Sequence, residues 1–187
     1  MPDNQTKAKR GAFLDRDGVL CRSRIIDGKA YAVRRLEEFR LLPGAVQAVA
    51  ALRQSGYAIV VVTNQPDIGN GWVEIEVVEA MHRRLRERLA PDAIEMCPHR
   101  QGDGCECRKP RPGMLRSAAA RLGIDLGRSV MVGDRWSDIV AGAEVGCYTV
   151  FIDRGYSEFL PVRPDCTVRS LRTAVDCIVA RAVSPDS

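Results

Sequence analysis

The sequence lacks any long run of hydrophobic residues, and this absence limits where the protein can act. No stretch approaches the roughly 20 consecutive apolar residues that a membrane-spanning helix needs. The first ten residues, MPDNQTKAKR, are polar and basic, without the apolar segment of a secretory signal peptide. We therefore expect a cytoplasmic protein with no membrane partner.

Internal repeats, low-complexity tracts and abrupt changes of composition are also absent from the 187 residues. A chain of this length, with 45% hydrophobic residues, has about the size of one domain with a single core. We expect a flexible N-terminal arm at residues 1–10, one domain at residues 11–183 and a short tail at residues 184–187. We also expect a monomer.

The chain has little excess charge, since its formal net charge is +4. So small a surplus is typical of ordinary surface residues. The basic stretch HRRLRERL, residues 82–89, is compatible with a nucleic-acid binding face, but its leucines fit an amphipathic helix with one solvated face equally well. A zinc-containing nucleic-acid binding module that uses the basic loop is the non-enzyme alternative. We favour the helix, expect no nucleic-acid partner, and place His82 at its surface or half buried.

What the sequence does contain is an alternation of short apolar runs with longer amphipathic segments. Continuous apolar strands separated by helices predict an α/β fold with a doubly wound, mostly parallel sheet and helices on both faces. The connection at residues 21–42 is too long for an ordinary turn and is a candidate flap. The predicted strands are residues 11–14, 58–62, 129–132, 148–152 and 166–168, and the predicted helices are residues 44–55, 72–89, 113–122 and 171–182.

Polar side chains follow the predicted strands directly, at the edge where parallel sheets bind ligands. Asp15 and Asp17 come after the first strand, and Gly18 allows the chain to turn away sharply. A lone Asp-x-Asp-Gly is more typical of a turn capped by its own side chains. What indicates a site is that other polar residues also follow predicted strands; these residues are Thr63, Asp134 and Asp138.

Four side chains of types that commonly bind metals lie within one loop, residues 97–107; they are Cys97, His99, Cys105 and Cys107. One imidazole and three thiolates make a complete tetrahedral set for a structural Zn²⁺, with no position left for a catalytic water. A disulfide or free thiols are the alternative. The remaining cysteines are scattered, and we expect them mostly as buried apolar residues; they are Cys21, Cys147, Cys166 and Cys177.

The order of these groups resembles the four motifs of the haloacid dehalogenase superfamily of phosphohydrolases, over residues 12–152. The motifs are DRDG, VVVTNQ, CRKP and VGDRWSD. The resemblance implies that Asp15 is a nucleophile that becomes an aspartyl-phosphate and that Asp17 is the general acid and base. It also implies a catalytic Mg²⁺ on Asp15, Asp134 and the Asp17 backbone carbonyl, with Asp138 reaching the metal directly or through bound water.

The same resemblance implies that Thr63 and Lys109 hold the phosphoryl oxygens. Lys109 alone would otherwise be a solvated surface lysine. Asn64, Arg108 and Arg135 would contact the substrate beyond its reacting phosphate.

The zinc loop followed by CRKPRPGM narrows the resemblance to the D-glycero-D-manno-heptose 1,7-bisphosphate 7-phosphatases, grouped with the histidinol-phosphatase type. These proteins lack a large cap domain, act on a small phosphorylated sugar and serve the biosynthesis of nucleotide-activated heptose. The loop TNQPDIGNG departs from the family's usual TNQSGIARG, with Pro66, Asp67 and Asn70 replacing two small residues and a basic one. This departure leaves the exact sugar and its anomer open. Histidinol phosphate, or another small phosphomonoester, is the alternative substrate.

Overall fold

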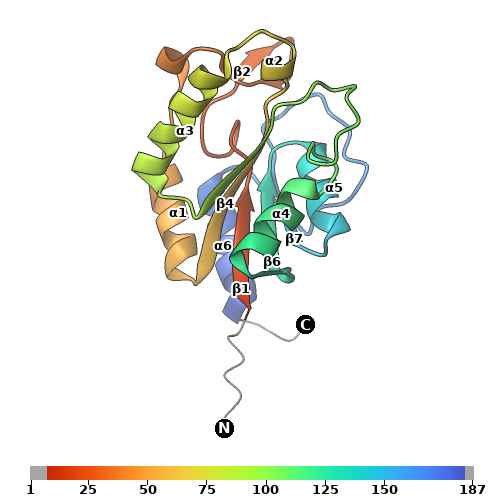
Figure 1. The fold of residues 1–187 in the computed structure, drawn as a ribbon. Helices are drawn as coiled ribbons and strands as arrows, with labels where there is room; N and C mark the ends of the chain where they lie inside the picture. The colour runs from red at the N-terminus through yellow and green to blue at the C-terminus, as the bar shows by residue number, and fades with distance from the viewer. Residues whose placement is uncertain (1–7, 184–187) are drawn as a thin grey trace.

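The computed structural model describes residues 8–183 and contains a six-stranded sheet in which every neighbouring pair is parallel (Figure 1). The strand order is β5-β4-β1-β6-β7-β8, so the first strand lies near the centre. The strands are β1 (Lys9–Leu14), β4 (Tyr57–Asn64), β5 (Ala93–Cys97), β6 (Ile124–Gly133), β7 (Tyr148–Ile152) and β8 (Cys166–Val168).

Helices cover both faces of the sheet, because alternate side chains of each strand point to opposite sides. Leu14 of β1 packs in the apolar cluster of α1 (Ala45–Gln54), α3 (Ile75–Leu89) and α6 (Leu171–Val183). Its neighbour Phe13 packs in the cluster of α4 (Gly113–Leu122) and α5 (Trp136–Glu144). This arrangement confirms the predicted doubly wound α/β fold.

The connection at residues 21–42 forms a small flap at the end of the sheet where the carboxyl ends of the strands lie (Figure 1). It contains an antiparallel hairpin of β2 (Arg24–Ile26) and β3 (Lys29–Tyr31), followed by the one-turn helix η1 (Leu36–Glu38). The short helix α2 (Pro66–Gly69) follows β4 at the same end. Between residues 8 and 183 no large cap domain is inserted.

Several element boundaries differ from the predicted ones; β6, for example, begins at Ile124 and not at residue 129. β1 begins at Lys9, inside the stretch expected as an N-terminal arm; residues 1–7 and the expected tail at 184–187 lie outside the described residues. Helix α3 begins at Ile75 and not at Trp72, because the backbone N–H groups of Trp72 and Val73 donate to the Asp67 carbonyl and close a turn. Strand β5 and helix α5 were not predicted.

The scattered cysteines require one correction. Cys21 and Cys147 are buried, as expected. Cys166 of β8 and Cys177 of α6 are instead joined as a disulfide. The short connection between β8 and α6 folds the helix back beside the strand, which brings together two sulfurs whose sequence spacing carries no such signal.

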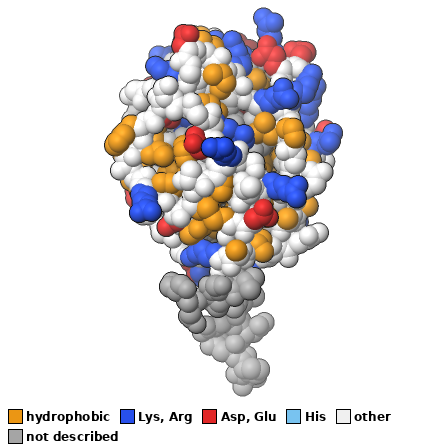
Figure 2. Space-filling view, turned by 180° about the vertical axis from the view of Figure 1, so that it is seen from behind, with side chains coloured by type: hydrophobic (Ala, Val, Ile, Leu, Met, Phe, Trp, Pro, Cys, Tyr) orange, Lys and Arg blue, Asp and Glu red, His pale blue; other side chains and the backbone are white. Residues whose placement is uncertain are grey.

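The surface shown in Figure 2 mixes basic, acidic and apolar side chains, and neither charge sign gathers into one continuous patch on that face. Within the part of the chain that the structure describes, no helix has the length and apolar character needed to cross a membrane.

Candidate active site

Apart from Asp134 and the four predicted zinc ligands, the predicted site residues line one cavity of about 220 Å³ at the carboxyl ends of the central strands. Asp15 follows β1, Thr63 ends β4, and Asp138 lies in the first turn of α5 after β6. Lys109 reaches the cavity from the loop before α4. The order of the parallel strands therefore brings together residues that lie as much as 123 positions apart in the sequence, from Asp15 to Asp138.

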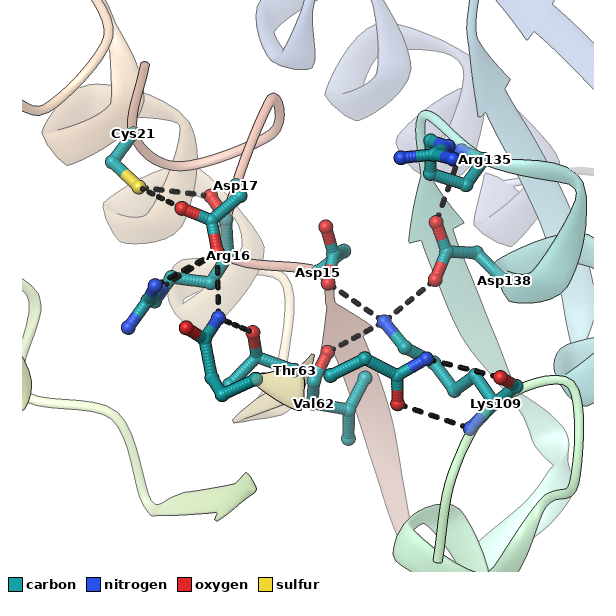
Figure 3. Close-up of polar contacts among 11 residues, drawn as sticks. Asp15, Arg16, Asp17, Cys21, Val62, Thr63, Lys109, Arg135 and Asp138 are labelled. Carbon is teal, nitrogen blue, oxygen red and sulfur yellow. Dashed lines mark hydrogen bonds and ion pairs between the residues drawn. The ribbon is translucent and has the colours of Figure 1, made fainter. Parts of the chain in front are cut away.

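Lys109 is the central cation of the site (Figure 3). Its Nζ lies 2.6 Å from Asp15 Oδ1 and 2.6 Å from Asp138 Oδ1, and it donates a hydrogen bond of 2.8 Å to the Val62 carbonyl. Burial alone would lower the pKa of this ammonium, but the charges of Asp138 and Asp15 raise it above its ordinary value. Lys109 is thus a buried, charged group of the site, and not the solvated surface lysine that it would be without its acidic partners.

Three buried carboxylates, from Asp15, Asp134 and Asp138, each place an oxygen within 4.8 Å of the others. Burial, together with the charges of Asp138 and Asp17, raises the pKa of Asp15 to about 7 against the opposing effect of Lys109. Burial and the charges of Asp15 and Asp138 likewise raise the pKa of Asp134 well above its ordinary value. The Tyr156 hydroxyl opposes this rise in pKa, but neither Asp134 oxygen has a partner at ordinary hydrogen-bond geometry among the described residues. These buried oxygens fit a hard divalent cation, which prefers oxygen ligands.

Gly18 makes this close packing of acids possible. Its φ of +85° lies in the left-handed region that favours glycine, and a Cβ at this position would overlap Asp134 Oδ2. The predicted sharp turn after Asp17 therefore serves a second purpose, since it lets the first loop approach the Asp134 carboxylate.

Asp17 points away from Lys109, toward Arg16 and Cys21 (Figure 3). Its Oδ2 accepts hydrogen bonds from Arg16 Nε at 2.9 Å and from Gln65 Nε2 at 2.8 Å, and Cys21 Sγ lies 3.5 Å from Oδ1. Gln65 Nε2 also donates to Thr63 Oγ1 at 2.8 Å. Sequence reasoning missed Arg16 and Gln65, although both stand inside quoted motifs, one between the two aspartates and the other after Thr63 and Asn64.

His82 is a second correction, because it is buried with an exposed fraction of 1%. Its Nε2 lies 3.2 Å from Nη1 of Arg16, whose own side chain is fully buried. Burial and the charge of Arg16 lower the pKa of His82 from 6.5 to about 4, so the imidazole is neutral near pH 7. His82 thus lies behind the Arg16–Asp17 pair and does not line the cavity.

Asn64 connects two of the motifs. Its Nδ2 donates to the Lys109 carbonyl at 3.0 Å, and its Oδ1 accepts from the Lys109 backbone N–H at 3.1 Å. Both polar atoms of the amide are thus used to hold the chain at Lys109, although Asn64 also lines the cavity.

The two arginines of the cavity differ in their pairing. Nη1 of Arg108 is buried and has no hydrogen-bond partner among the described residues. Arg135 is engaged, because it forms an ion pair with Glu158, its Nε donates to Glu158 Oε2 at 2.8 Å, and its Nη1 donates to the Ala30 carbonyl at 3.0 Å. Arg135 thereby ties the hairpin of the flap to the loop after β7.

The four predicted zinc ligands meet in space as well as in sequence. The Sγ of Cys97 lies 3.5 Å from the Sγ of Cys105 and 3.6 Å from His99 Nδ1. The Sγ of Cys107 lies 3.2 Å from His99 Nδ1 and 3.6 Å from the Sγ of Cys105. Ligands about 2.3 Å from one tetrahedral ion are separated from each other by about 3.8 Å, so these spacings fit Zn²⁺.

Comparisons with known proteins agree with this geometry. A family model described as HAD-hydrolase-like matches residues 106–174. A D-glycero-beta-D-manno-heptose-1,7-bisphosphate 7-phosphatase of Pseudomonas aeruginosa is 41% identical over 148 residues, which cover 76% of this chain and 80% of that protein. The chain belongs to the heptose-bisphosphate phosphatase family of the haloacid dehalogenase superfamily.

Members of this phosphatase family that differ in their named substrate anomer are about equally similar to the chain. A D-glycero-alpha-D-manno-heptose-1,7-bisphosphate 7-phosphatase of Mycobacterium tuberculosis is 39% identical over 151 residues, covering 75% of this chain and 77% of that protein. A crystal structure of the D,D-heptose 1,7-bisphosphate phosphatase of B. bronchiseptica, in complex with magnesium and phosphate, superposes with a TM-score of 0.79 at 33% identity. It covers 92% of this chain and 99% of that one.

Proposed function

We propose that this phosphatase removes the 7-phosphate of D-glycero-D-manno-heptose 1,7-bisphosphate, in the biosynthesis of nucleotide-activated heptose. The observation that carries the proposal is the buried arrangement of Lys109 between Asp15 and Asp138, with the buried carboxylate of Asp134 in the same acidic cluster. The relatives named for this reaction support the choice of substrate.

The acidic cluster would hold a catalytic Mg²⁺ through Asp15, Asp134 and the Asp17 backbone carbonyl. Asp138 already forms an ion pair with Lys109 and accepts from the Arg135 backbone N–H at 3.1 Å, so we assign it to the metal's bound water and to Lys109. When bound, the cation supplies positive charge that offsets the negative charge of the phosphate and the carboxylates. The solved relative in complex with magnesium supports this assignment.

Asp15 is the proposed nucleophile. One of its carboxylate oxygens forms a bond to phosphorus while the bond from phosphorus to the sugar oxygen breaks, which gives an aspartyl-phosphate and a sugar alkoxide. Asp17 donates a proton to that alkoxide. Asp17 then takes a proton from the water that attacks the phosphorus, and this second step releases inorganic phosphate and restores Asp15.

The remaining residues position the two reactants. Lys109 neutralises the phosphoryl oxygens, with Thr63 as a hydroxyl donor to them, and Asn64 fixes Lys109 through its backbone. Arg108 offers its unpartnered Nη1 to an anionic part of the substrate. Arg135 can bind a second phosphate only by exchanging its partner Glu158, so we assign Arg108 the larger share of that binding.

The cysteine loop is proposed to bind a structural Zn²⁺ through Cys97, His99, Cys105 and Cys107. The loop ends one residue before Arg108, so the energy of metal binding would fix the chain that carries Arg108 and Lys109. Because all of the proposed catalytic groups come from one chain, we also propose that a monomer is active.

A panel of substrates tests this function. We expect a specificity constant for one anomer of heptose 1,7-bisphosphate that exceeds the value for histidinol phosphate by about a hundredfold or more. The Asp15→Asn variant, which keeps the size of the side chain, should lose all turnover and keep its circular dichroism spectrum. Turnover by that variant would rule out the nucleophile, and a preference for histidinol phosphate would replace the proposed substrate with the alternative one.

A further inference from the structure

One wall of the active-site cavity is built by three residues outside the catalytic motifs: Arg34 of the flap, Asp67 of α2, and Trp72 between α2 and α3. Asp67 and Trp72 line the same cavity as Asp15 and Lys109. Arg34 joins the other two, because its Nε lies 2.7 Å from Asp67 Oδ2 and its guanidinium carbon lies 4.6 Å from the centre of a Trp72 ring. We call these three residues the distal wall.

The charge of the distal wall decides what it can bind. An unpaired carboxylate at Asp67 would repel a phosphorylated substrate and attract a cationic one. The side chain of Asp67 is only 10% exposed, and its ion pair with Arg34 cancels its net charge. The wall is therefore neutral, and it offers no unpaired charge that would recognise the ammonium group of an amino alcohol.

The surface of the distal wall combines an acceptor with an apolar plane. Arg34 occupies Oδ2 of Asp67, and no described side chain donates a hydrogen bond to Oδ1, which leaves that oxygen able to accept from a hydroxyl group. Trp72 is 57% exposed although Arg34 lies over one of its rings. A hydroxyl acceptor beside an exposed indole matches a sugar chain, which has O–H groups on some edges and C–H groups on others.

We propose that Arg34, Asp67 and Trp72 form a specificity subsite for the polyhydroxylated carbon chain of the substrate. This inference rests on the proposed function in one respect, namely that the reacting phosphate of the substrate binds at Asp15. In this subsite Asp67 accepts a substrate hydroxyl, Trp72 covers the C–H face, and Arg34 is a positioning residue that holds both. The flap that carries Arg34 thereby contributes to specificity without a large cap domain.

Selectivity between two substrates tests the subsite. The specificity constants for heptose 1,7-bisphosphate and for p-nitrophenyl phosphate, which has no polyol chain, are measured for Trp72→Ala, Trp72→Phe and the double variant Arg34→Ala/Asp67→Ala, which removes the acceptor and keeps the wall neutral. We expect Trp72→Ala and the double variant each to lower the ratio of the sugar to the nitrophenyl constant by about tenfold, mainly through KM for the sugar. Trp72→Phe should restore most of the ratio because it keeps an aromatic plane.

A matched control lies in the same flap. Arg22 is exposed, and no hydrogen bond or ion pair of its side chain is found among residues 8–183, so Arg22→Ala should keep the wild-type ratio. An unchanged ratio in Trp72→Ala and in the double variant would overturn the proposal, as would an equal loss on both substrates, which would indicate a structural role.

The failure of this inference can be told apart from failure of the proposed function. If heptose 1,7-bisphosphate is not turned over, the same ratio is measured with sedoheptulose 7-phosphate and other polyol phosphates. A tenfold fall of the ratio for the best of these would support the subsite while the heptose assignment fails. No fall for any polyol phosphate would overturn the subsite.

Discussion

The buried pair of Arg16 and His82 predicts a specific dependence of stability on pH. The Arg16 guanidinium lies 3.2 Å from His82 Nε2, and burial with this charge lowers the pKa of His82 from 6.5 to about 4. Within α3, Glu79 opposes this shift from 3.6 Å, and Arg86 adds to it. The native state therefore keeps His82 neutral at a pH where the unfolded chain protonates it.

The sign of the effect follows from proton binding. Between pH 6.5 and pH 4 the unfolded state binds more protons than the native state, so the stability contributed by the neutral His82 is present above pH 6.5 and is lost as the pH falls. At pH 5 the two pKa values give a loss of about 2 kcal/mol relative to pH 8, from a total of about 3 kcal/mol.

His82→Gln removes this titration and keeps a side-chain oxygen that can accept from Arg16. Urea unfolding followed by circular dichroism between pH 5 and pH 8 gives the free energy of unfolding of both proteins. All other groups that titrate are the same in the wild type and the variant. The difference between their two curves of unfolding free energy against pH therefore isolates His82. We expect the wild type to lose about 2 kcal/mol more than the variant from pH 8 to pH 5. Parallel curves, or a steeper loss in the variant, would refute the reasoning.

Three further changes test separate parts of the structure. Asn64→Ala frees the backbone at Lys109 and should lower kcat by about tenfold in steady-state assays, whereas a change confined to KM would contradict a role in holding that lysine. Cys105→Ser should lower both the bound zinc, measured by elemental analysis, and the melting temperature; equal zinc and melting temperature would contradict a structural site. Leu115→Ala, at a fully buried position of α4, should cost about 3 kcal/mol in urea unfolding with KM unchanged, and a cost below about 1 kcal/mol would contradict its place in the core.

The gathering of the acidic motifs was predictable because it depends on topology. Parallel strands place their carboxyl ends at one edge of the sheet, so Asp15, Thr63 and Asp134 had to meet once β1, β4 and β6 were adjacent. The convergence of the four predicted zinc ligands was predictable for a simpler reason. These ligands lie within eleven residues, and a short loop has few ways to separate them.

Strand β5 and helix α5 escaped prediction because their patterns are weak. β5, with the sequence AIEMC, lies at the edge of the sheet and has a glutamate at its centre, so it has neither a continuous apolar run nor strict alternation. Helix α5 begins inside a catalytic motif, and the site's polar residues occupy its first turn. These polar residues interrupt the regular spacing of apolar residues by which a helix is recognised in a sequence.

The partners of the charged groups could not be read from the sequence. Asp17 faces Arg16 and Gln65, and His82 is buried against Arg16, because a turn of the first loop and the packing of α3 bring these groups together. The same holds for Asn64 and Arg135, which were expected to contact substrate and are bonded in the structure to the Lys109 backbone and to Glu158. Spacing along the chain specifies the residue types of a site but not which of them pair.

The position of phosphate release tests the central claim most directly. Phosphorus NMR of the reaction with each anomer of heptose 1,7-bisphosphate distinguishes the phosphate at C1 from the one at C7. We predict that the C7 resonance disappears as inorganic phosphate forms, while the C1 resonance of at least one anomer remains. Loss of the C1 phosphate first, or no release from either anomer by the Mg²⁺-supplied and zinc-replete protein, would contradict the account.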